Sequence, residues 1–157
     1  MEQSAALING LMSDVFNDIL KIEEVTLRRG PFSDVSVTEV HTVEAIGMYA
    51  QITASEAAKR LNITAGTLTV AVNNLEKKGY VTRFRDEEDR RLVKLGLTKK
   101  GRLLYRVHER FHLQMVRACI TGLSAEEEKV LVSAFRGLHA FLSGFYQDDE
   151  GSKEEAR

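Results

Sequence analysis

Residues 79–98, GYVTRFRDEEDRRLVKLGLT, form the part of the chain whose composition is typical of β-strands. Val81–Arg85 and Leu92–Leu97 are short runs that favour β-structure, and the second run alternates apolar residues with lysine and glycine. The polar segment Asp86–Arg91 joins them, which predicts a β-hairpin with a charged tip. A two-stranded ribbon is only marginally stable on its own, so another element must pack against it.

Six helices are predicted around this hairpin. Segments beginning at Ser36, Thr53 and Ser124 fit the capping box, in which a hydroxyl and a carboxylate three residues later satisfy free amides at the start of a helix. Glycines follow three of the apolar-periodic stretches, where a left-handed residue can end a helix. The helices are expected near Ala5–Leu27, Thr38–Met48, Ser55–Leu61, Ala65–Lys78, Lys99–Ile120 and Ala125–Tyr146.

The two helices within Thr53–Gly79 are separated by a short link around Asn62, which is typical of a helix-turn-helix. A recognition helix usually enters the major groove with its N-terminal end, so small hydroxyls near that end can reach phosphates and base edges. Asn73 could read adenine or contact phosphate. With the hairpin added the segment resembles a winged helix, whereas a plain surface helix is the alternative. The buried stripe of the second helix is expected to contain Ala65, Leu68, Val72 and Leu75.

Charge is distributed unevenly along the chain. The 157 residues carry a formal net charge of −1, yet residues 77–102 contain ten Lys and Arg against four Asp and Glu, a local excess of six positive charges. A basic middle indicates a surface that binds polyanions. On charge alone, a solvated surface of mixed charge is the alternative. Residues 148–157 form an acidic tail that is expected to be disordered.

The first and last helices are apolar over more than one face, which implies that a second chain covers them. A homodimer built from both termini is therefore expected, with an internally packed helical hairpin as the alternative. The single Cys excludes an intrachain disulfide and a thiolate zinc finger. The first twenty residues lack the cationic start of a signal peptide, and no apolar run approaches the ~20 residues of a membrane span. We expect a cytoplasmic protein.

Three segments of the middle of the chain together form a recognisable signature: Asn74-Leu-Glu-Lys-Lys-Gly79-Tyr-Val, Arg85-Asp-Glu-Glu-Asp89-Arg90-Arg91 and Leu97-Thr98-Lys-Lys-Gly101. Their order and spacing resemble the signature of MarR-family winged-helix repressors. The resemblance implies a mainly α fold, in which residues 1–147 form a single MarR-type domain with one β-hairpin wing. Within it, residues 36–98 would form the winged helix-turn-helix DNA-binding lobe, and the long helices of residues 1–30 and 99–147 would form the dimerisation arms.

The same resemblance implies a set of DNA contacts. In that family a wing arginine enters the minor groove, which corresponds to Arg91, with Asp89 orienting it and Arg90 available to a phosphate. A guanidinium is favoured in a narrow, electronegative groove, so the physical argument agrees. The expected partner is a pseudo-palindromic double-stranded operator. The candidate DNA-binding residues are Thr53, Thr64, Gly66, Thr67, Thr69, Asn73, Lys77, Arg85, Asp89, Arg90 and Arg91.

Motifs outside that signature are similar to the MarR-type repressor of fatty acid biosynthesis of Gram-positive bacteria. They are Ile22-Glu-Glu-Val, Glu39–Gly47, Gly66-Thr-Leu-Thr and Leu104–His112. This resemblance implies repression of type II fatty acid synthesis genes, with long-chain acyl-acyl carrier protein as corepressor. Candidates for the effector pocket are Leu11, Val15, Ile19, Ile22, His41, Leu104, His108, Phe111, His112 and Met115. Candidates for a basic patch that binds the acidic carrier protein are Arg28, Arg29, Arg102, Arg106 and Arg110.

Other repressors of the family answer to small aromatic ligands, oxidants or metals, and these remain alternatives. His108 and His112 lie one helical turn apart and could bind zinc together with Glu24 or His41, although histidines at this spacing are more often structural. We expect no cofactor and no metal. Cys119 is expected to be a buried, unactivated thiol.

An enzyme is not expected. The sequence lacks a G-x-S-x-G motif, and residues 96–103 only approach the pattern of a phosphate-binding loop. A helical scaffold that binds other proteins would explain the apolar terminal helices. It would leave the charged segment Asp89-Arg90-Arg91 unexplained.

Overall fold

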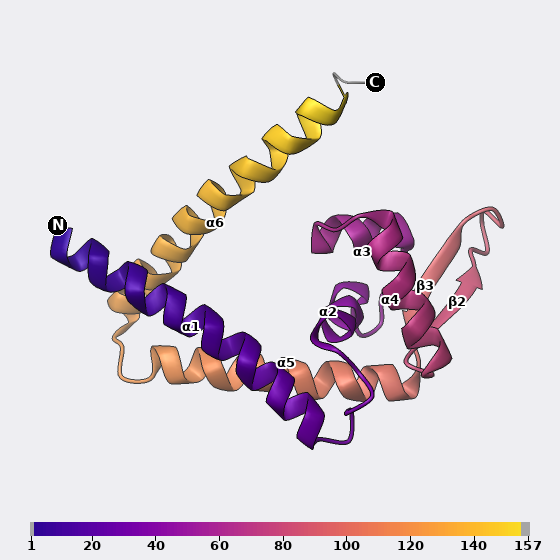
Figure 1. Cartoon of the computed structure of the whole chain (residues 1–157), viewed down its shortest axis with the longest axis horizontal. Helices are drawn as coiled ribbons and strands as arrows, with labels where there is room; N and C mark the ends of the chain where they lie inside the picture. The colour runs from indigo at the N-terminus through magenta and orange to yellow at the C-terminus, as the bar shows by residue number, and fades with distance from the viewer. Residues whose placement is uncertain (1, 155–157) are drawn as a thin grey trace. The chain divides into compact units, whose positions relative to one another are not determined.

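The computed structural model describes the backbone of residues 2–154 and the side chains of residues 2–145 (Figure 1). The chain divides into two units, one ending at Phe111 and the other beginning at His112. The mainly α fold with a small antiparallel sheet confirms the expected fold class. The elements in chain order are α1 (Glu2–Arg29), α2 (Val37–Ile46), β1 (Ile52–Thr53), α3 (Ala54–Leu61), α4 (Ala65–Lys77), β2 (Val81–Arg85), β3 (Val93–Leu97), α5 (Lys99–Ile120) and α6 (Ala125–Glu154).

The expected hairpin is present, but it belongs to a three-stranded sheet of order β1-β3-β2. In its register Val81 of β2 pairs with Leu97 of β3, and Ile52 of β1 pairs with Leu95 on the other side of β3. Strand β1 was not predicted. A strand of two residues is too short to show the alternation of apolar and polar residues by which strands are predicted. Its residue Ile52 is also buried in the core.

The helix starts follow the predicted caps. Ser36, Thr53 and Ser124 each accept a hydrogen bond from the amide three residues later, and the carboxylate at that position accepts one from the cap amide. These three capping boxes are confirmed. The last helix continues past its predicted end at Tyr146, as far as Glu154. It thus includes most of the segment expected to be a disordered tail, while residues 155–157 lie outside the described residues.

The core of the first unit lies between α2, α3, α4 and the sheet. Leu68, Val72 and Leu75 of α4 are buried as predicted, but Ala65 is exposed and Ala71 is buried in its place. The prediction for Ala65 was wrong because the first turn of α4 extends beyond the elements that cover its later turns. The remaining apolar core residues are Phe32, Val35, Val40, Val43, Ile46, Ile52, Ala57, Ala58, Tyr80, Val81, Leu95, Leu97 and Leu104.

The base of the hairpin packs tightly on α5. A Cβ atom added at Gly101 would lie 2.1 Å from the carbonyl oxygen of Tyr80, so only glycine permits this approach. Gly79, just after α4, has φ +78°, a left-handed conformation that turns the chain into β2. Gly101 thus lets the hairpin approach α5, and Gly79 joins the hairpin to α4.

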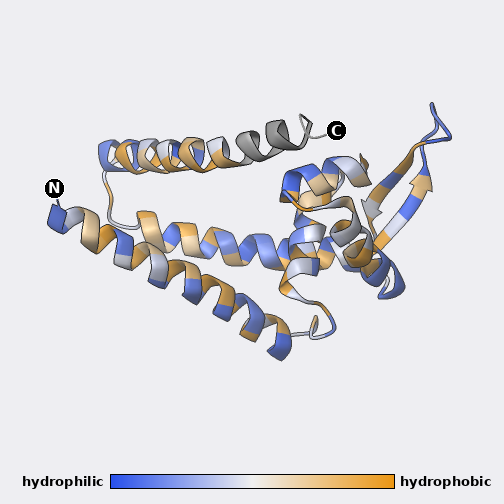
Figure 2. Ribbon diagram, turned by 45° about the horizontal axis from the view of Figure 1, so that its top comes forward, coloured by the Kyte–Doolittle hydropathy of each residue, from blue (hydrophilic) through white to orange (hydrophobic). Residues whose placement is uncertain are grey.

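Apolar residues recur along α1 and, separately, along α6 (Figure 2), and many of them are exposed. Leu7, Phe16 and Leu20 of α1 are 54–65% exposed, and Val130 and Phe141 of α6 are 64–70% exposed. These faces agree with the sequence pattern that suggested a second chain. None of the helices in the described part of the chain is long and apolar enough to cross a membrane.

Cys119 is exposed, so the prediction of a buried thiol was wrong for this chain. Its neighbour Val116 is 51% exposed, which shows that this stretch of α5 is not covered by the elements of its own unit.

Candidate nucleic-acid interface

The turn of the helix-turn-helix depends on one asparagine. Asn62 adopts φ 51° and ψ 45°, a left-handed conformation that asparagine tolerates, and its amide donates to the last carbonyls of α3. Thr64 then caps α4 by accepting the amide of Thr67 at 3.1 Å, and the two threonine hydroxyls lie 2.9 Å apart. Thr53 is half-buried and its hydroxyl serves the capping box of α3, so it has less freedom to contact DNA than the sequence suggested.

One face of α4 presents most of the predicted DNA contacts to solvent. At the N-terminal end of this face, the free amides of the first turn of α4 add a partial positive charge. The hydroxyl of Thr69 donates to the carbonyl of Ala65 at 2.7 Å. Since a hydroxyl has a single proton to donate, Thr69 has none left for a phosphate while it makes this bond. The exposed residues of this face are Thr64, Gly66, Thr67, Thr69, Asn73 and Lys77.

A side chain of the wing reaches back to this helix. Arg83 of β2 donates from Nη2 to Asn73 Oδ1 and from Nη1 to Glu76 Oε2, both at 2.7 Å. Arg83 is one of the ten basic residues of the region 77–102, but it was not among the predicted DNA-binding residues. The alternation of exposed and covered positions in a strand does not reveal which helix lies next to it.

The tip of the wing is held by Asp86. Its carboxylate accepts the amides of Glu88 at 2.8 Å and Asp89 at 2.9 Å, and it forms an ion pair with Lys94 across the hairpin. The hydrogen bond from Lys94 is the main reason that the pKa of Asp86 falls to about 2, and the two amides lower it further. The charged tip is therefore a structured turn.

Arg91 lies just beyond this turn with a side chain that is 95% exposed. Its amide donates to Asp89 Oδ1 at 3.0 Å, and its Nε lies 3.8 Å from the same oxygen. Asp89 is thus placed to orient Arg91 without covering it. Arg85 and Arg90 are also exposed, so the wing carries several cations that can approach a polyanion.

Buried polar contacts fix the wing and α4 on the rest of the lobe. Tyr80 donates to Asp34 Oδ1 at 2.7 Å, and Lys100 lies 4.0 Å from the centre of the Tyr80 ring. Burial, then the hydrogen bond to Asp34, raises the pKa of Tyr80, and the same hydrogen bond lowers the pKa of Asp34. Lys78, at the end of α4, donates to both carboxylate oxygens of Glu39 on α2 at 2.7–2.8 Å.

Comparison with known proteins places this geometry in a family. The profile of the MarR family matches residues 33–92. Streptococcus pneumoniae FabT, whose crystal structure was solved in complex with DNA, is 46% identical, with 90% of this chain and 99% of that chain covered and a TM-score of 0.82. The chain belongs to the MarR family.

Two other relatives are more distantly similar. The HTH-type transcriptional regulator PchR of Bacillus subtilis is 23% identical over 121 residues, which cover 75% of this chain and 72% of PchR. S. aureus MepR in a DNA complex is 22% identical, with 86% and 97% covered and a TM-score of 0.66, and it shares the fold. This MarR-family chain is a DNA-binding transcriptional regulator, and its relatives are regulators rather than enzymes.

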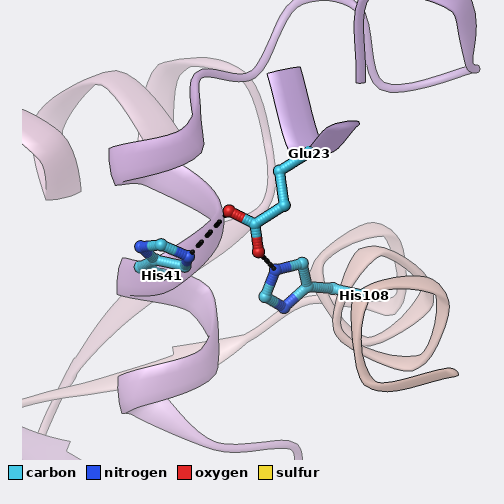
Figure 3. A group of neighbouring side chains, drawn as sticks. All are labelled: Glu23, His41 and His108. Atoms are coloured by element: carbon cyan, nitrogen blue, oxygen red, sulfur yellow. Dashed lines mark hydrogen bonds and ion pairs between the residues drawn. The ribbon is translucent and has the colours of Figure 1, made fainter. Parts of the chain in front are cut away.

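A second cluster of this MarR-family chain joins three helices (Figure 3). Glu23 of α1 is 4% exposed, and its carboxylate lies between two imidazoles. The distances are 3.1 Å from Oε1 to Nε2 of His108 on α5 and 3.4 Å from Oε2 to Nε2 of His41 on α2. These three residues bring ligand atoms close enough together to hold a metal ion. The centres of the two imidazole rings are 5.6 Å apart.

The carboxylate of this cluster is not the one that the sequence suggested. Of the two residues expected to join the histidines, Glu24 is exposed and pairs with Arg28 at 2.6 Å, whereas His41 lies in the cluster. Successive helical residues differ by about 100° in direction. Glu23 therefore shares the covered stripe of α1 with Ile19 and Leu27, which are half-buried, while Glu24 points away.

The predicted effector pocket is only partly assembled within the first unit. A small apolar cavity of about 30 Å³ is lined by Leu104, His108 and Phe111 together with Glu23, Thr26, Leu27 and Val107. Leu11, Val15 and Ile22 of α1 are exposed and do not line it, and neither does Ile19. His112 and Met115 belong to the second unit. The cavity has room for about one water molecule, so an acyl chain would require it to open.

A larger cleft of about 710 Å³ lies elsewhere in the first unit. It is bounded by the end of α1, the segment 33–39 and the end of α4, and it includes Glu24, Asn74 and Lys78. Its size is within the range of small-molecule sites. None of the ten predicted effector-pocket residues lines it.

The predicted basic patch is reduced by internal contacts. Arg28 pairs with Glu24, and Arg102 is half-buried and donates to the carbonyl of Leu97 at 2.7 Å. The Arg28 side chain nevertheless stays 75% exposed, and Arg29, Arg106 and Arg110 are exposed as well.

Proposed function

We propose that this regulator is a repressor that binds a pseudo-palindromic duplex as a homodimer. The observation that carries the proposal is the exposed face of α4 beside a structured wing that presents Arg91. A single lobe covers only one half-site, and two lobes related by a twofold axis would place their recognition helices about 34 Å apart. The uncovered apolar face of α1 supplies a surface through which two copies could associate.

The genes that this repressor controls are, on our proposal, those of type II fatty acid synthesis. The support is the resemblance of four motifs to the repressor of fatty acid biosynthesis, together with the 46% identity to FabT over nearly the whole of that chain. Long-chain acyl-acyl carrier protein would be the corepressor. Its acidic surface would meet Arg29, Arg106 and Arg110, which remain exposed.

The coupling between corepressor and DNA would pass through the Glu23–His41–His108 cluster. Leu104, His108 and Phe111 line the small apolar cavity, so an acyl chain that opened it would displace His108 or Glu23. His41 joins this cluster to α2, which packs against α4. A coupling free energy of ~1–3 kcal/mol would raise operator affinity several-fold.

A binding titration tests this proposal. Duplexes from promoters of type II fatty acid synthesis genes are titrated with the protein alone, with acyl-free carrier protein and with long-chain acyl-carrier protein, and anisotropy is recorded. We expect several-fold tighter binding only with the acylated form, and no change on adding a chelator. Equal affinity with all three would refute the corepressor assignment.

Zinc sensing is a second candidate, and the Glu23–His41–His108 cluster is the observation that favours it. Zinc binds histidine nitrogens at about 2.0–2.1 Å and carboxylate oxygens at a similar distance, so one ion between these side chains would need only small shifts from the 3.1–3.4 Å contacts. On this reading chelation abolishes DNA binding and zinc restores it, while acyl-carrier protein has no effect. His41→Gln should then abolish the response, with the exposed Glu24→Gln as its matched control.

A further inference from the structure

Arg83 joins the two DNA-reading elements through a fork of hydrogen bonds. Its guanidinium reaches from β2 to two side chains that lie one turn apart on α4, Asn73 and Glu76, at 2.7 Å each. The side chains of Arg83 and Glu76 are 33% and 40% exposed, so this clamp lies at the edge of the proposed DNA surface and not in the core.

The chemistry of arginine fixes the orientation of the Asn73 amide. A guanidinium carries only donors, so the atom of Asn73 that faces Arg83 must be the carbonyl oxygen. The oxygen has a second lone pair, but the guanidinium holds it toward β2, so the amide nitrogen with its two N–H groups is the end of Asn73 left for DNA. An asparagine that reads adenine needs both ends, because the oxygen accepts from N6 of the base while the nitrogen donates to N7.

We propose that Arg83 is a positioning residue that makes Asn73 a donor only, so that Asn73 contacts a phosphate oxygen and does not select adenine. This inference rests on the proposed function, since it concerns how the same surface recognises DNA. It replaces the adenine contact that the sequence allowed for Asn73. The clamp also holds the Glu76 carboxylate on Arg83, which neutralises a negative charge that would otherwise face the phosphates.

The proposal is tested by affinity selection from a library of randomised duplexes, followed by sequencing, with the full-length wild-type protein and variants. In Arg83→Lys the positive charge remains, but a lysine cannot hold both partners in the geometry of a guanidinium fork. We expect Arg83→Lys and Arg83→Met to acquire a preference for adenine at one position of each half-site. The enrichment at that position should be roughly 5- to 150-fold, the range of a bidentate contact. Arg60→Lys is the matched control: it is the same substitution at an arginine whose hydrogen bond goes to the backbone carbonyl of Ala45 and not to a side chain of α4.

Variants of Asn73 test the donor role separately from Arg83. Asn73→Ala and Asn73→Asp both remove the N–H donors, and the aspartate keeps an acceptor for Arg83. Both should bind the selected duplexes more weakly at every sequence, with base preferences unchanged. Asn73→Asp should lose more affinity than Asn73→Ala, because its carboxylate also repels the phosphate. Thermal unfolding of each variant should match the wild type, because half-exposed ion pairs contribute little to folding.

Two results would overturn the inference alone. One is an Arg83→Lys profile identical to that of the wild type, and the other is the loss of an adenine preference in Asn73→Ala. A wild-type protein that selects no sequence would instead overturn the proposed function, and the inference with it.

Discussion

Replacing Arg91 with alanine should weaken DNA binding without changing the stability of the fold. The Arg91 side chain is 95% exposed, and its nearest charged partner in the described chain is Asp89, 3.8 Å away. An exposed ion pair of this kind contributes at most about 1 kcal/mol to stability. The amide of Arg91, which holds the turn at Asp89 Oδ1, is retained in Arg91→Ala. The variant should therefore unfold at the same temperature as the wild type.

The effect on DNA binding should be much larger. A guanidinium in a narrow minor groove contributes about 1–3 kcal/mol, and the proposed homodimer would insert two. The loss is then ~2–6 kcal/mol for the operator, which corresponds to roughly 30-fold or more in the dissociation constant. Because the contact is favoured where the groove is narrow, the preference for A·T base pairs at the wing positions should fall as well.

Anisotropy titrations at several salt concentrations measure both quantities. Lys77→Ala is the control, since Lys77 is exposed in the last turn of α4 and is expected to contact phosphate. It should weaken binding to all sequences alike and reduce the salt slope by about 1 per lobe. If Arg91→Ala left both operator affinity and the A·T preference unchanged, the assignment of Arg91 to the minor groove would be wrong.

Three other perturbations follow from the structure. Phe16→Asp places a charge on the exposed apolar face of α1 and should convert a micromolar dimer into a monomer in sedimentation; a wild type that is already monomeric would contradict the homodimer. Gly101→Ala puts a Cβ 2.1 Å from the Tyr80 carbonyl and should lower the free energy of unfolding by about 1–3 kcal/mol or more, whereas Gly137→Ala, with nothing within 4 Å, should not destabilise. The pKa of Asp86 lies below its ordinary 3.8, so its contacts stabilise the wing tip above that pH and are lost as pH falls toward about 2; an NMR titration of Asp86 with a midpoint near 3.8 would contradict this.

Much of the secondary structure could be predicted because its causes are local. The capping boxes at Ser36, Thr53 and Ser124 are spacings of three residues, and the hairpin strands are short runs of β-favouring residues joined by a polar turn. Exposure of the α4 face likewise follows from helical periodicity. Each of these features requires only neighbours in the sequence, so no knowledge of packing was needed.

Features that depend on contacts between distant segments could not be predicted in the same way. Glu23 and Glu24 point in directions about 100° apart on α1, as successive helical residues do. Because the apolar pattern of α1 is broad, the sequence does not show which of the two faces the other helices. Arg83 reaches Asn73 because β2 lies beside α4, and β1 exists because Ile52 meets Leu95 on the far side of β3. Position in space, rather than residue type, decides these roles.

The element that links the two clusters of polar contacts is α2. Glu39, near its start, accepts both hydrogen bonds from Lys78 at the end of the recognition helix. His41, two residues later, contacts Glu23 of α1, which also contacts His108 of α5. Both carboxylates are at least nine-tenths buried, so removing either partner would leave a costly unpaired charge. On the proposed function, a ligand that displaces Glu23 or His108 would therefore move α2. Helix α4 would move with it, because breaking the Glu39–Lys78 pair costs more free energy than a small shift of both helices.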